Sequence, residues 1–334
     1  MAIGQSVETV ATEVASGTGF ALLVALAAAA RRPREELEAE LAATLSDVGD
    51  TEGELWLNLV GVALDAGPPY DAERLRRALG SLDALELRRH VLGRYAWSWC
   101  TLAGTDDIEA AARGDDAAAE RLLEHPRYYA GHARASLTTL LQLDPDESRE
   151  RLLRAVEAGG ALVDDDAAAR LDAAERTAAD SLATSSALTA IQHLTNGYHY
   201  RPEPEAERVV LVPHLEPDVS LVLAQHRSAR LIVYRAEADR TSKERVLALG
   251  RALADPKRVE ILGLVGRGVG RASDLVAETG LSRSTVHHHL AQLRETGLVA
   301  LEGNARAYAY VPRRTAAADA AALIAELIQT EEDR

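Results

Sequence analysis

The chain has 334 residues, of which 47% are hydrophobic and 4% aromatic, and its net charge is −15. This length is enough for two or three domains, and an alanine-rich composition with few aromatic residues is typical of a mainly helical protein. The single cysteine excludes an internal disulfide framework and is typical of a cytoplasmic protein.

The first apolar stretch, residues 14–30, carries no charge and follows Glu8 and Glu13 rather than a basic segment. It consists mostly of alanine and glycine and is too weakly apolar for a membrane span, so we expect a buried helix over 7–31 and no membrane partner. The sequence Gly-Thr-Gly-Phe at 17–20 is no dinucleotide fingerprint, because we predict no strand before it.

Further helical segments follow without a fixed period, which predicts an irregular helical domain over residues 1–200. Asp71, Asp115 and Asp146 are plausible helix caps. The Asp run at 164–166 is interpreted as a solvated turn and helix start rather than a metal site. The predicted helices are 34–47, 52–66, 71–79, 83–103, 106–113, 115–124, 127–142, 146–158 and 167–193.

A proline-broken connection at 201–206 precedes three runs rich in β-branched residues, at 209–212, 219–224 and 230–235. They predict a small, mostly antiparallel sheet that connects two domains over residues 201–238.

The pattern after residue 239 predicts a winged helix-turn-helix over 239–314. A helix over 242–253 is followed by a second that starts at Asp255-Pro256, and a third opens near Ser273 and ends at Gly280. Ser282 caps a fourth helix, which Gly297 ends, and two strands follow around 302–310. An apolar stripe on 316–329 predicts a dimerisation helix in residues 315–334.

Charge supports a nucleic-acid partner for this segment. Residues 241–314 contain 12 Lys and Arg against 7 Asp and Glu, whereas residues 1–240 contain 24 against 40. The positive charge is therefore concentrated where a phosphate backbone would be met.

The helix after Ser282 has two faces. Val286, Leu290 and Leu293 form the buried stripe, and His289 shares that side. The opposite face predicts contacts with base edges and phosphates, although a merely solvated face is the alternative. The three consecutive histidines point in different directions and cannot bind one metal ion. The predicted DNA-binding residues are Ser282, Arg283, Ser284, Thr285, His287, His288 and Arg294 on the helix, with Asn304 and Arg306 in the wing.

The segments LADPKRVEILGLV, GLSRSTVHHHLAQLRETGLV and YAYV resemble the winged helix-turn-helix of ArsR-type bacterial repressors. The resemblance implies a homodimer that binds an operator. In that family the position of His287 usually carries a smaller residue. The paired cysteines near the first reader helix, and the Asp and His pairs on the last helix, that bind metals in simpler relatives are absent from this sequence. We therefore expect no metal and no cofactor.

The N-terminal part, with ELRRHVLGRYAWSW and HLTNGYHY, resembles the helical domain of unknown function that precedes the winged helix in some actinobacterial ArsR-type regulators. This resemblance implies no particular ligand. Aromatic residues there predict either a ligand pocket or core anchors, with core favoured. The pocket candidates are Tyr95, Trp97, Trp99, Tyr128, Tyr129 and His132, and a further group, Tyr198, His199 and Tyr200, lies before the predicted sheet.

Taken together, these patterns predict a mainly α protein with an irregular N-terminal helical domain, a small antiparallel sheet linker, and a C-terminal winged helix-turn-helix with a terminal dimerisation helix. Its expected function is that of a cytoplasmic, non-enzymatic DNA-binding regulator, most simply a repressor, acting as a homodimer on a pseudo-palindromic operator and modulated through its N-terminal domain, which would sense an unknown small molecule or a partner. The alternatives are a ligand-binding or enzymatic helical domain with an accessory winged-helix tail, and a winged helix that contacts protein only.

Overall fold

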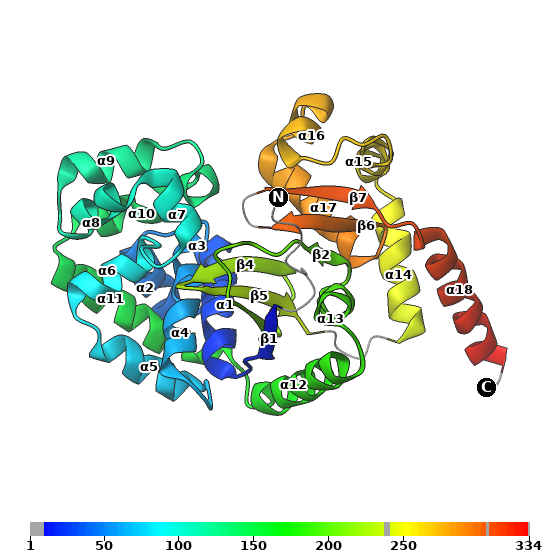
Figure 1. Ribbon diagram of the computed structural model, residues 1–334, viewed down its shortest axis with the longest axis horizontal. Helices are drawn as coiled ribbons and strands as arrows, with labels where there is room; N and C mark the ends of the chain where they lie inside the picture. The colour runs from blue at the N-terminus through cyan, green and yellow to red at the C-terminus, as the bar shows by residue number, and fades with distance from the viewer. Residues whose placement is uncertain (1–9, 237–240, 305–306, 333–334) are drawn as a thin grey trace, which may run out of the picture. The chain divides into compact units, whose positions relative to one another are not determined.

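The computed structural model describes residues 10–236, 241–304 and 307–332, and the protein is mainly helical, as the sequence predicts (Figure 1). It divides into two compact units. The N-terminal unit comprises residues 1–180 and 204–236, and the C-terminal unit comprises residues 181–203 and 237–334. The chain therefore passes from one unit to the other after residues 180, 203 and 236.

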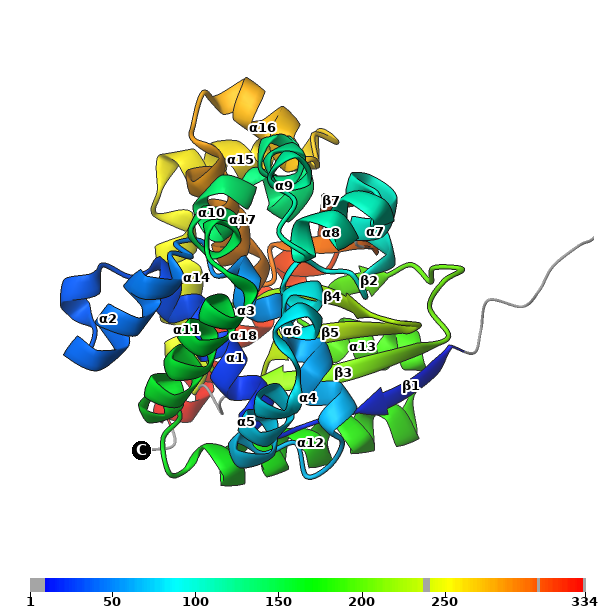
Figure 2. The same cartoon turned by 90° about the vertical axis from the view of Figure 1, so that its left-hand side faces the viewer.

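The N-terminal unit combines many short helices with one sheet (Figure 2). Its strands are β1 (Ala11–Val14), β3 (Arg208–His214), β4 (Leu221–His226) and β5 (Ala229–Arg235). Its α-helices are α1 (Thr18–Arg31), α2 (Ala39–Val48), α3 (Glu54–Asn58), α4 (Val60–Ala66), α5 (Ala72–Ser81), α6 (Ala84–Val91), α7 (Trp97–Ala103), α8 (Thr105–Ala112), α9 (Asp116–Glu124), α10 (Ala133–Gln142), α11 (Pro145–Ala158) and most of α12 (Ala167–Thr184). Short 3-10 helices lie at Arg34–Glu36, Tyr128–Gly131 and Gly159–Leu162.

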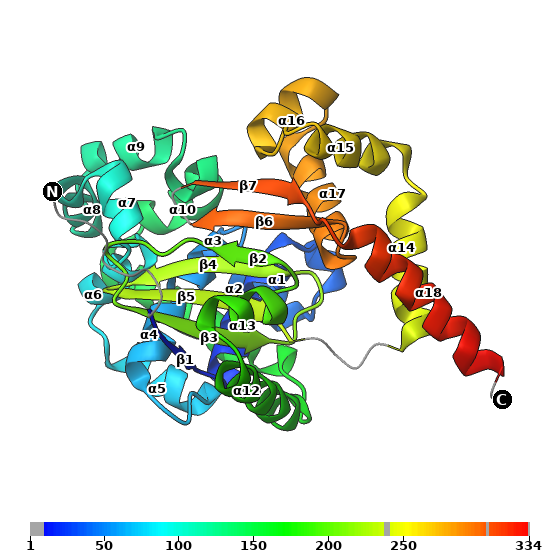
Figure 3. The same cartoon turned by 45° about the vertical axis from the view of Figure 1, so that its right-hand side comes forward.

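Helix α1 lies at the centre of this unit. Every residue from Gly19 to Ala30 is buried, and the helix packs against β3, which lies in front of it in Figure 3. A helix that is apolar on all sides is stable in water only when other elements surround it. The prediction of a buried helix is therefore confirmed for residues 18–31. No described helix is long and apolar enough to cross a membrane.

The start of α1 differs from the prediction. Residues 11–14 form strand β1, which pairs in parallel with β3 (Ala11 opposite Arg208), so a strand does precede Gly17. Gly17 and Gly19 nevertheless lie directly against the backbone of the protein itself. A Cβ on Gly17 would lie 2.3 Å from the Tyr70 carbonyl oxygen, and the Gly19 N–H donates to that oxygen at 2.8 Å. Backbone thus occupies the place that a phosphate would need.

The sheet has the strand order β1-β3-β5-β4. Only the β4–β5 pair is antiparallel, as expected, whereas β1–β3 and β3–β5 are parallel. The prediction of mostly antiparallel pairing was wrong for β3–β5, because these strands are joined through the edge strand β4 and run in the same direction. Strand β1 was not predicted. The residues of β3 and β5 are almost all buried, which explains their continuous apolar runs.

The C-terminal unit contains the winged helix-turn-helix and two elements that come from residues 181–203. A three-stranded sheet has the order β2-β6-β7, with β2 parallel to β6 and β6 antiparallel to β7. Its elements are α13 (Ala187–Leu194), β2 (Tyr198–Tyr200), α14 (Ser242–Leu253), α15 (Pro256–Gly266), α16 (Ala272–Thr279), α17 (Arg283–Glu295), β6 (Val299–Asn304), β7 (Ala307–Pro312) and α18 (Ala316–Glu332).

The helix boundaries of this unit follow local chemistry. The Asp255 carboxylate accepts from the N–H groups of Lys257 (2.8 Å) and Arg258 (3.2 Å), as predicted. Gly280 and Gly297 have φ values of 66° and 73°, the left-handed conformation that ends a helix. Helix α14 begins with a capping box between Thr241 and Glu244. In the N-terminal unit, Asp71 and Asp115 are caps as predicted. Asp144 rather than Asp146 caps α11.

Candidate nucleic-acid interface

Helix α17 is held by a compact core. Val286, Leu290 and Leu293 have no exposed surface and pack with residues of α15, α16 and β6. Ser282 caps the helix, because its hydroxyl accepts from the Thr285 N–H at 3.2 Å. Its hydroxyl also bonds to that of Thr285 at 2.7 Å. The N-terminal turn of α17 is therefore fixed before any ligand binds.

The opposite side of α17 carries polar groups. Arg283 and His288 are exposed, while Thr285 and His287 are half-buried. His288 Nε2 lies 3.0 Å from the side-chain nitrogen of Gln292, one turn further along. Gln292 therefore belongs to the same surface, and its i, i+4 spacing from His288 was the sequence signal for it. The side chain of Ser284 lies outside the described part of the structure.

The three consecutive histidines diverge. His289 is 8% exposed, and burial lowers its pKa. The rings of His288 and His289 are 6.1 Å apart with a 56° angle between their planes. The sequence predicts a satisfied core or dimer-facing histidine; His289 is buried, but its Nδ1 has no hydrogen-bond partner in the part of the chain that the structure describes. Among the described residues, no group of three or more His, Cys, Asp or Glu side chains is arranged to hold a metal ion.

Arg294 does not share the outward surface. It is 4% exposed, and its Nη1 donates to the Thr195 carbonyl oxygen at 2.7 Å. We therefore leave it out of the candidate interface, although the sequence suggested a phosphate contact. Its position four residues after Leu290 places it on the buried side, a spacing that the sequence already contained.

The wing is formed by β6 and β7. Asn304 is half-buried at the end of β6, and its side-chain oxygen accepts from the Ala307 N–H at 3.3 Å. It thereby stabilises the turn between the two strands. Arg306, the other predicted wing contact, lies outside the described residues.

The aromatic residues of the N-terminal unit separate into two groups. Tyr128 and Tyr129 are fully buried, and Trp99 packs on both at ring-centroid distances of 5.5 and 6.1 Å. Tyr128 donates to the Leu92 carbonyl at 2.6 Å, and burial raises the pKa of both tyrosines. These three residues are core anchors. His132, 3.8 Å from Glu52, does not line the pocket described next.

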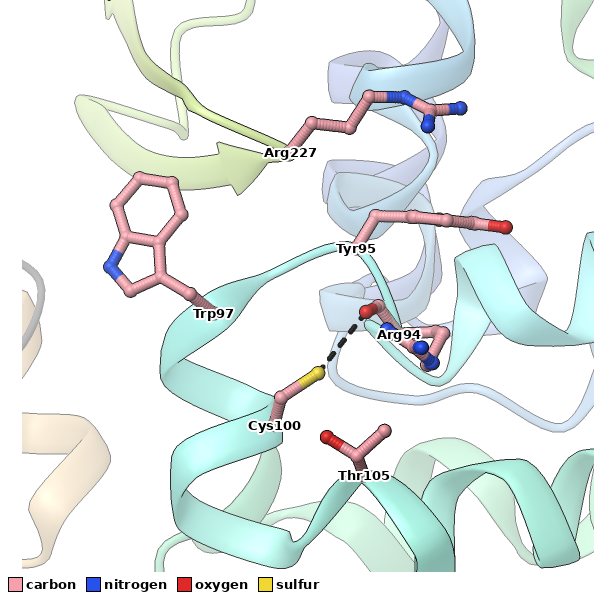
Figure 4. A pocket seen from close by; sticks show the side chains of 6 residues that line it. All are labelled: Arg94, Tyr95, Trp97, Cys100, Thr105 and Arg227. Carbon is pink, nitrogen blue, oxygen red and sulfur yellow. Dashed lines mark hydrogen bonds between the residues drawn. The ribbon is translucent and has the colours of Figure 1, made fainter. Parts of the chain in front are cut away.

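Tyr95 and Trp97 do line a surface pocket of about 320 Å³, together with Arg94, Cys100, Thr105 and Arg227 (Figure 4). Their rings point away from one another, so they do not form two parallel walls. The Arg227 guanidinium lies 4.9 Å from the Tyr95 ring centroid and bonds to Asp65. This pocket thus contains two of the six predicted pocket residues.

Tyr95 also belongs to a group of polar side chains in which His90 and His226 are buried and Asp65 is exposed. His226 Nε2 lies 2.8 Å from an Asp65 carboxylate oxygen, and the His226 ring stacks on His90 at 5.6 Å. Tyr95 donates to Glu86. Burial, followed by the nearby His226, lowers the pKa of His90 to about 4. Burial and the bond to Glu86 raise the pKa of Tyr95 to about 12.

Helix α17 is capped, its apolar stripe is buried, and a two-stranded wing follows it. Together these features define a winged helix-turn-helix domain of the kind that reads DNA. Residues 255–300 match the family described as bacterial regulatory protein, arsR family. The chain is 43% identical over 90 residues to the HTH-type transcriptional regulator CmtR of Mycobacterium tuberculosis strain H37Rv, a match that covers 26% of this chain and 72% of that protein.

It is also 37% identical over 70 residues to the HTH-type transcriptional regulator YgaV of Escherichia coli K12, with 21% of this chain and 71% of YgaV covered. The chain therefore belongs to the ArsR family, and its C-terminal domain is a DNA-binding transcriptional-regulator domain. No solved structure matches the chain.

Proposed function

We propose that the protein is a transcriptional repressor that binds a pseudo-palindromic operator as a homodimer. Each α17 would enter a major groove, with Arg283 and His288 directed at base edges and Asn304 of the wing near the flanking backbone. The observation that carries this proposal is the division of α17 into a fully buried apolar stripe and an outward polar face. Because the cap and the core already fix the helix, binding would require little ordering of it.

The test begins with selection of duplexes from a random-sequence pool by the full chain, followed by gel-shift titration at several salt concentrations. We expect a palindromic sequence to be enriched and its affinity to fall steeply with salt. Arg283→Ala should raise the Kd for that duplex by about five- to 150-fold, which corresponds to about 1–3 kcal/mol for a bidentate contact with guanine.

Arg176→Ala is the matched control, because it removes the same charge from an exposed position on α12, in the N-terminal unit and outside the winged helix. Its affinity should stay within about twofold of the unchanged protein, as expected for a charge remote from the duplex. If no sequence is enriched and no duplex binds even at low salt, the regulator proposal fails and a protein-contact role for the winged helix replaces it.

A small-molecule effector site in the N-terminal unit is our second proposal. The pocket at Tyr95 and Trp97 supports it, because it combines aromatic surface with guanidinium, hydroxyl and thiol groups. The protein purified from its own cells should carry a bound small molecule, detected by native mass spectrometry, that is lost in Tyr95→Ala and Trp97→Ala.

His132→Ala, outside the pocket, should retain the molecule. Two results together would argue against an effector in this pocket: the purified protein carries no additional mass, and no member of a metabolite library raises its melting temperature.

A further inference from the structure

The C-terminal end of α17 is capped by a residue nearly a hundred positions earlier in the chain. The Asn196 side-chain nitrogen donates to the carbonyl oxygens of Arg294 (3.1 Å) and Glu295 (2.8 Å). Its side-chain oxygen accepts from Arg313 Nη1 at 3.1 Å. The last carbonyls of a helix have no partner within it. The Gly297 N–H reaches the Arg294 oxygen at 2.9 Å, and the Asn196 amide adds a further bond there and one to the Glu295 oxygen.

The contact is reciprocal. Arg294 reaches back from α17 and donates to the Thr195 carbonyl oxygen at 2.7 Å, inside the protein. The Thr195 hydroxyl in turn accepts from the Tyr198 N–H at 3.1 Å and donates to the Ile191 carbonyl at 2.5 Å. The turn that carries Asn196 is therefore tied both to α17 and to its own flanking elements.

The same segment also holds the wing. Strand β2 pairs in parallel with β6, and the Tyr198 hydroxyl donates to the Gly303 carbonyl oxygen at 3.1 Å. The Arg201 N–H donates to that same oxygen at 2.9 Å, and the Arg201 side chain forms an ion pair with Glu302. The structure thus attaches both DNA-facing elements, α17 and the wing, to residues 195–201, which we call the clamp segment.

The chain on both sides of the clamp segment leads into the N-terminal unit. The clamp segment lies within residues 181–203, and the residues on both sides of that stretch, up to 180 and from 204, belong to the N-terminal unit. A displacement of either flank acts on the clamp segment through covalent bonds. Two of the three passages of the chain between the units lie at the ends of this stretch.

We infer that the clamp segment sets the orientation of α17 and the wing for DNA binding, with Asn196 as a positioning residue, and that it carries changes in the N-terminal unit to them. This inference rests on the proposed DNA-binding function. Base contacts require a defined helix orientation, whereas phosphate contacts tolerate small shifts. Loss of the clamp should therefore reduce sequence discrimination more than overall DNA affinity.

Asn196→Gly is the variant of choice. Asn196 has a φ of 52°, in the left-handed region that glycine adopts without strain. The substitution therefore removes the side-chain amide, and the backbone can keep the conformation of the turn. Gln192→Ala is the matched control, because it removes a side-chain amide from an exposed position on the adjacent helix α13.

Both full-length variants are titrated, well below their melting temperatures, with the duplex selected by the unchanged protein and with a random duplex. Asn196→Gly should raise the Kd for the selected duplex by about tenfold, as expected for two or three lost hydrogen bonds, and leave the Kd for random DNA within about twofold. Gln192→Ala should alter neither value. An equal loss on both duplexes, or no change on either, overturns the inference.

Arg294→Ala provides a second, independent test. Because Arg294 bonds to the clamp segment, its removal should reproduce the loss of sequence discrimination without changing the salt dependence of binding. If Arg294 instead contacts phosphate, its removal weakens both duplexes alike and reduces the salt slope by about one, and the inference is wrong. If the unchanged protein selects no sequence, the proposed function fails at an earlier and separate step.

Discussion

Two buried histidines in the N-terminal unit make its stability dependent on pH. Burial lowers the pKa of His90 to about 4, with a further contribution from the neighbouring His226, whereas Glu86 and Asp65 act in the opposite direction. Burial lowers the pKa of His214 to about 3. Both side chains are therefore neutral in the folded protein at pH 5, while an unfolded histidine is largely protonated at that pH.

Because a histidine with a depressed pKa takes up a proton on unfolding once the pH is below the unfolded pKa, stability should fall as the pH decreases from about 6.5 toward 4. For His90 the loss at pH 5 is about 2 kcal/mol. His90→Gln should therefore reduce the difference in melting temperature between pH 7 and pH 5, measured by circular dichroism. His132→Gln, a half-exposed histidine of the same unit, is the control. An unaltered pH dependence in His90→Gln would show that another group causes the loss.

Single residues also mark the limit of inference from sequence. Ser282, Asp255 and Gly280 were predictable because a cap or a left-handed turn acts on groups two to four positions away. Arg294 was misassigned because an arginine near the end of a polar helix is usually solvated. Its partner, the Thr195 carbonyl, lies 99 positions away, and no local pattern indicates it.

At the level of elements, strands whose own residues carry a β pattern were predicted, whereas strands that form only by pairing with a distant segment were not. The β3 and β5 runs were recognisable from their buried β-branched residues. Strands β1 and β2 have only four and three residues, and each pairs in parallel with a strand far away in the sequence. Short segments of this kind acquire strand structure from tertiary pairing rather than from intrinsic preference.

Helix α17 was the best-predicted part of the candidate site. Its cap, buried stripe and C-terminal glycine all follow from spacings of three or four residues. The sequence did not predict that Asn196 would cap its C-terminal end or that strand β2 would pair with the neighbouring wing. For that reason the predicted interface contained the outward-facing residues of α17 but lacked the residues that hold the helix.

The aromatic clusters illustrate the same point for the N-terminal unit. Trp99, Tyr128 and Tyr129 are core, whereas Tyr95 and Trp97 line a pocket. All five lie in predicted helical segments, and composition gave no means to separate the two groups. The outcome depends on which helices pack together, and that is a property of the whole unit.

At the scale of the whole molecule, helices α14 and α18 form the candidate surface for assembly with a second copy. These helices pack together, and the Ser242 hydroxyl donates to Glu326 at 2.5 Å. Ile324 and Ile328 remain 44% and 55% exposed on α18, and Leu247 of α14 is 51% exposed. Such an apolar stripe on a helix pair in the C-terminal unit suits burial against a second copy of the same surface.

We therefore predict that Ile324→Asp combined with Ile328→Asp converts the proposed homodimer into a monomer, because unpaired carboxylates are costly in an apolar interface. Analytical ultracentrifugation would measure the mass, with Ala322→Asp, two residues away from the stripe on the same helix, as the control. The monomer should lose most of its affinity for a palindromic duplex and keep weak binding to a half-site, since a dimer contacts two half-sites about 34–36 Å apart. If the doubly substituted chain remains a dimer, another surface joins the two copies and sets the separation of their reader helices.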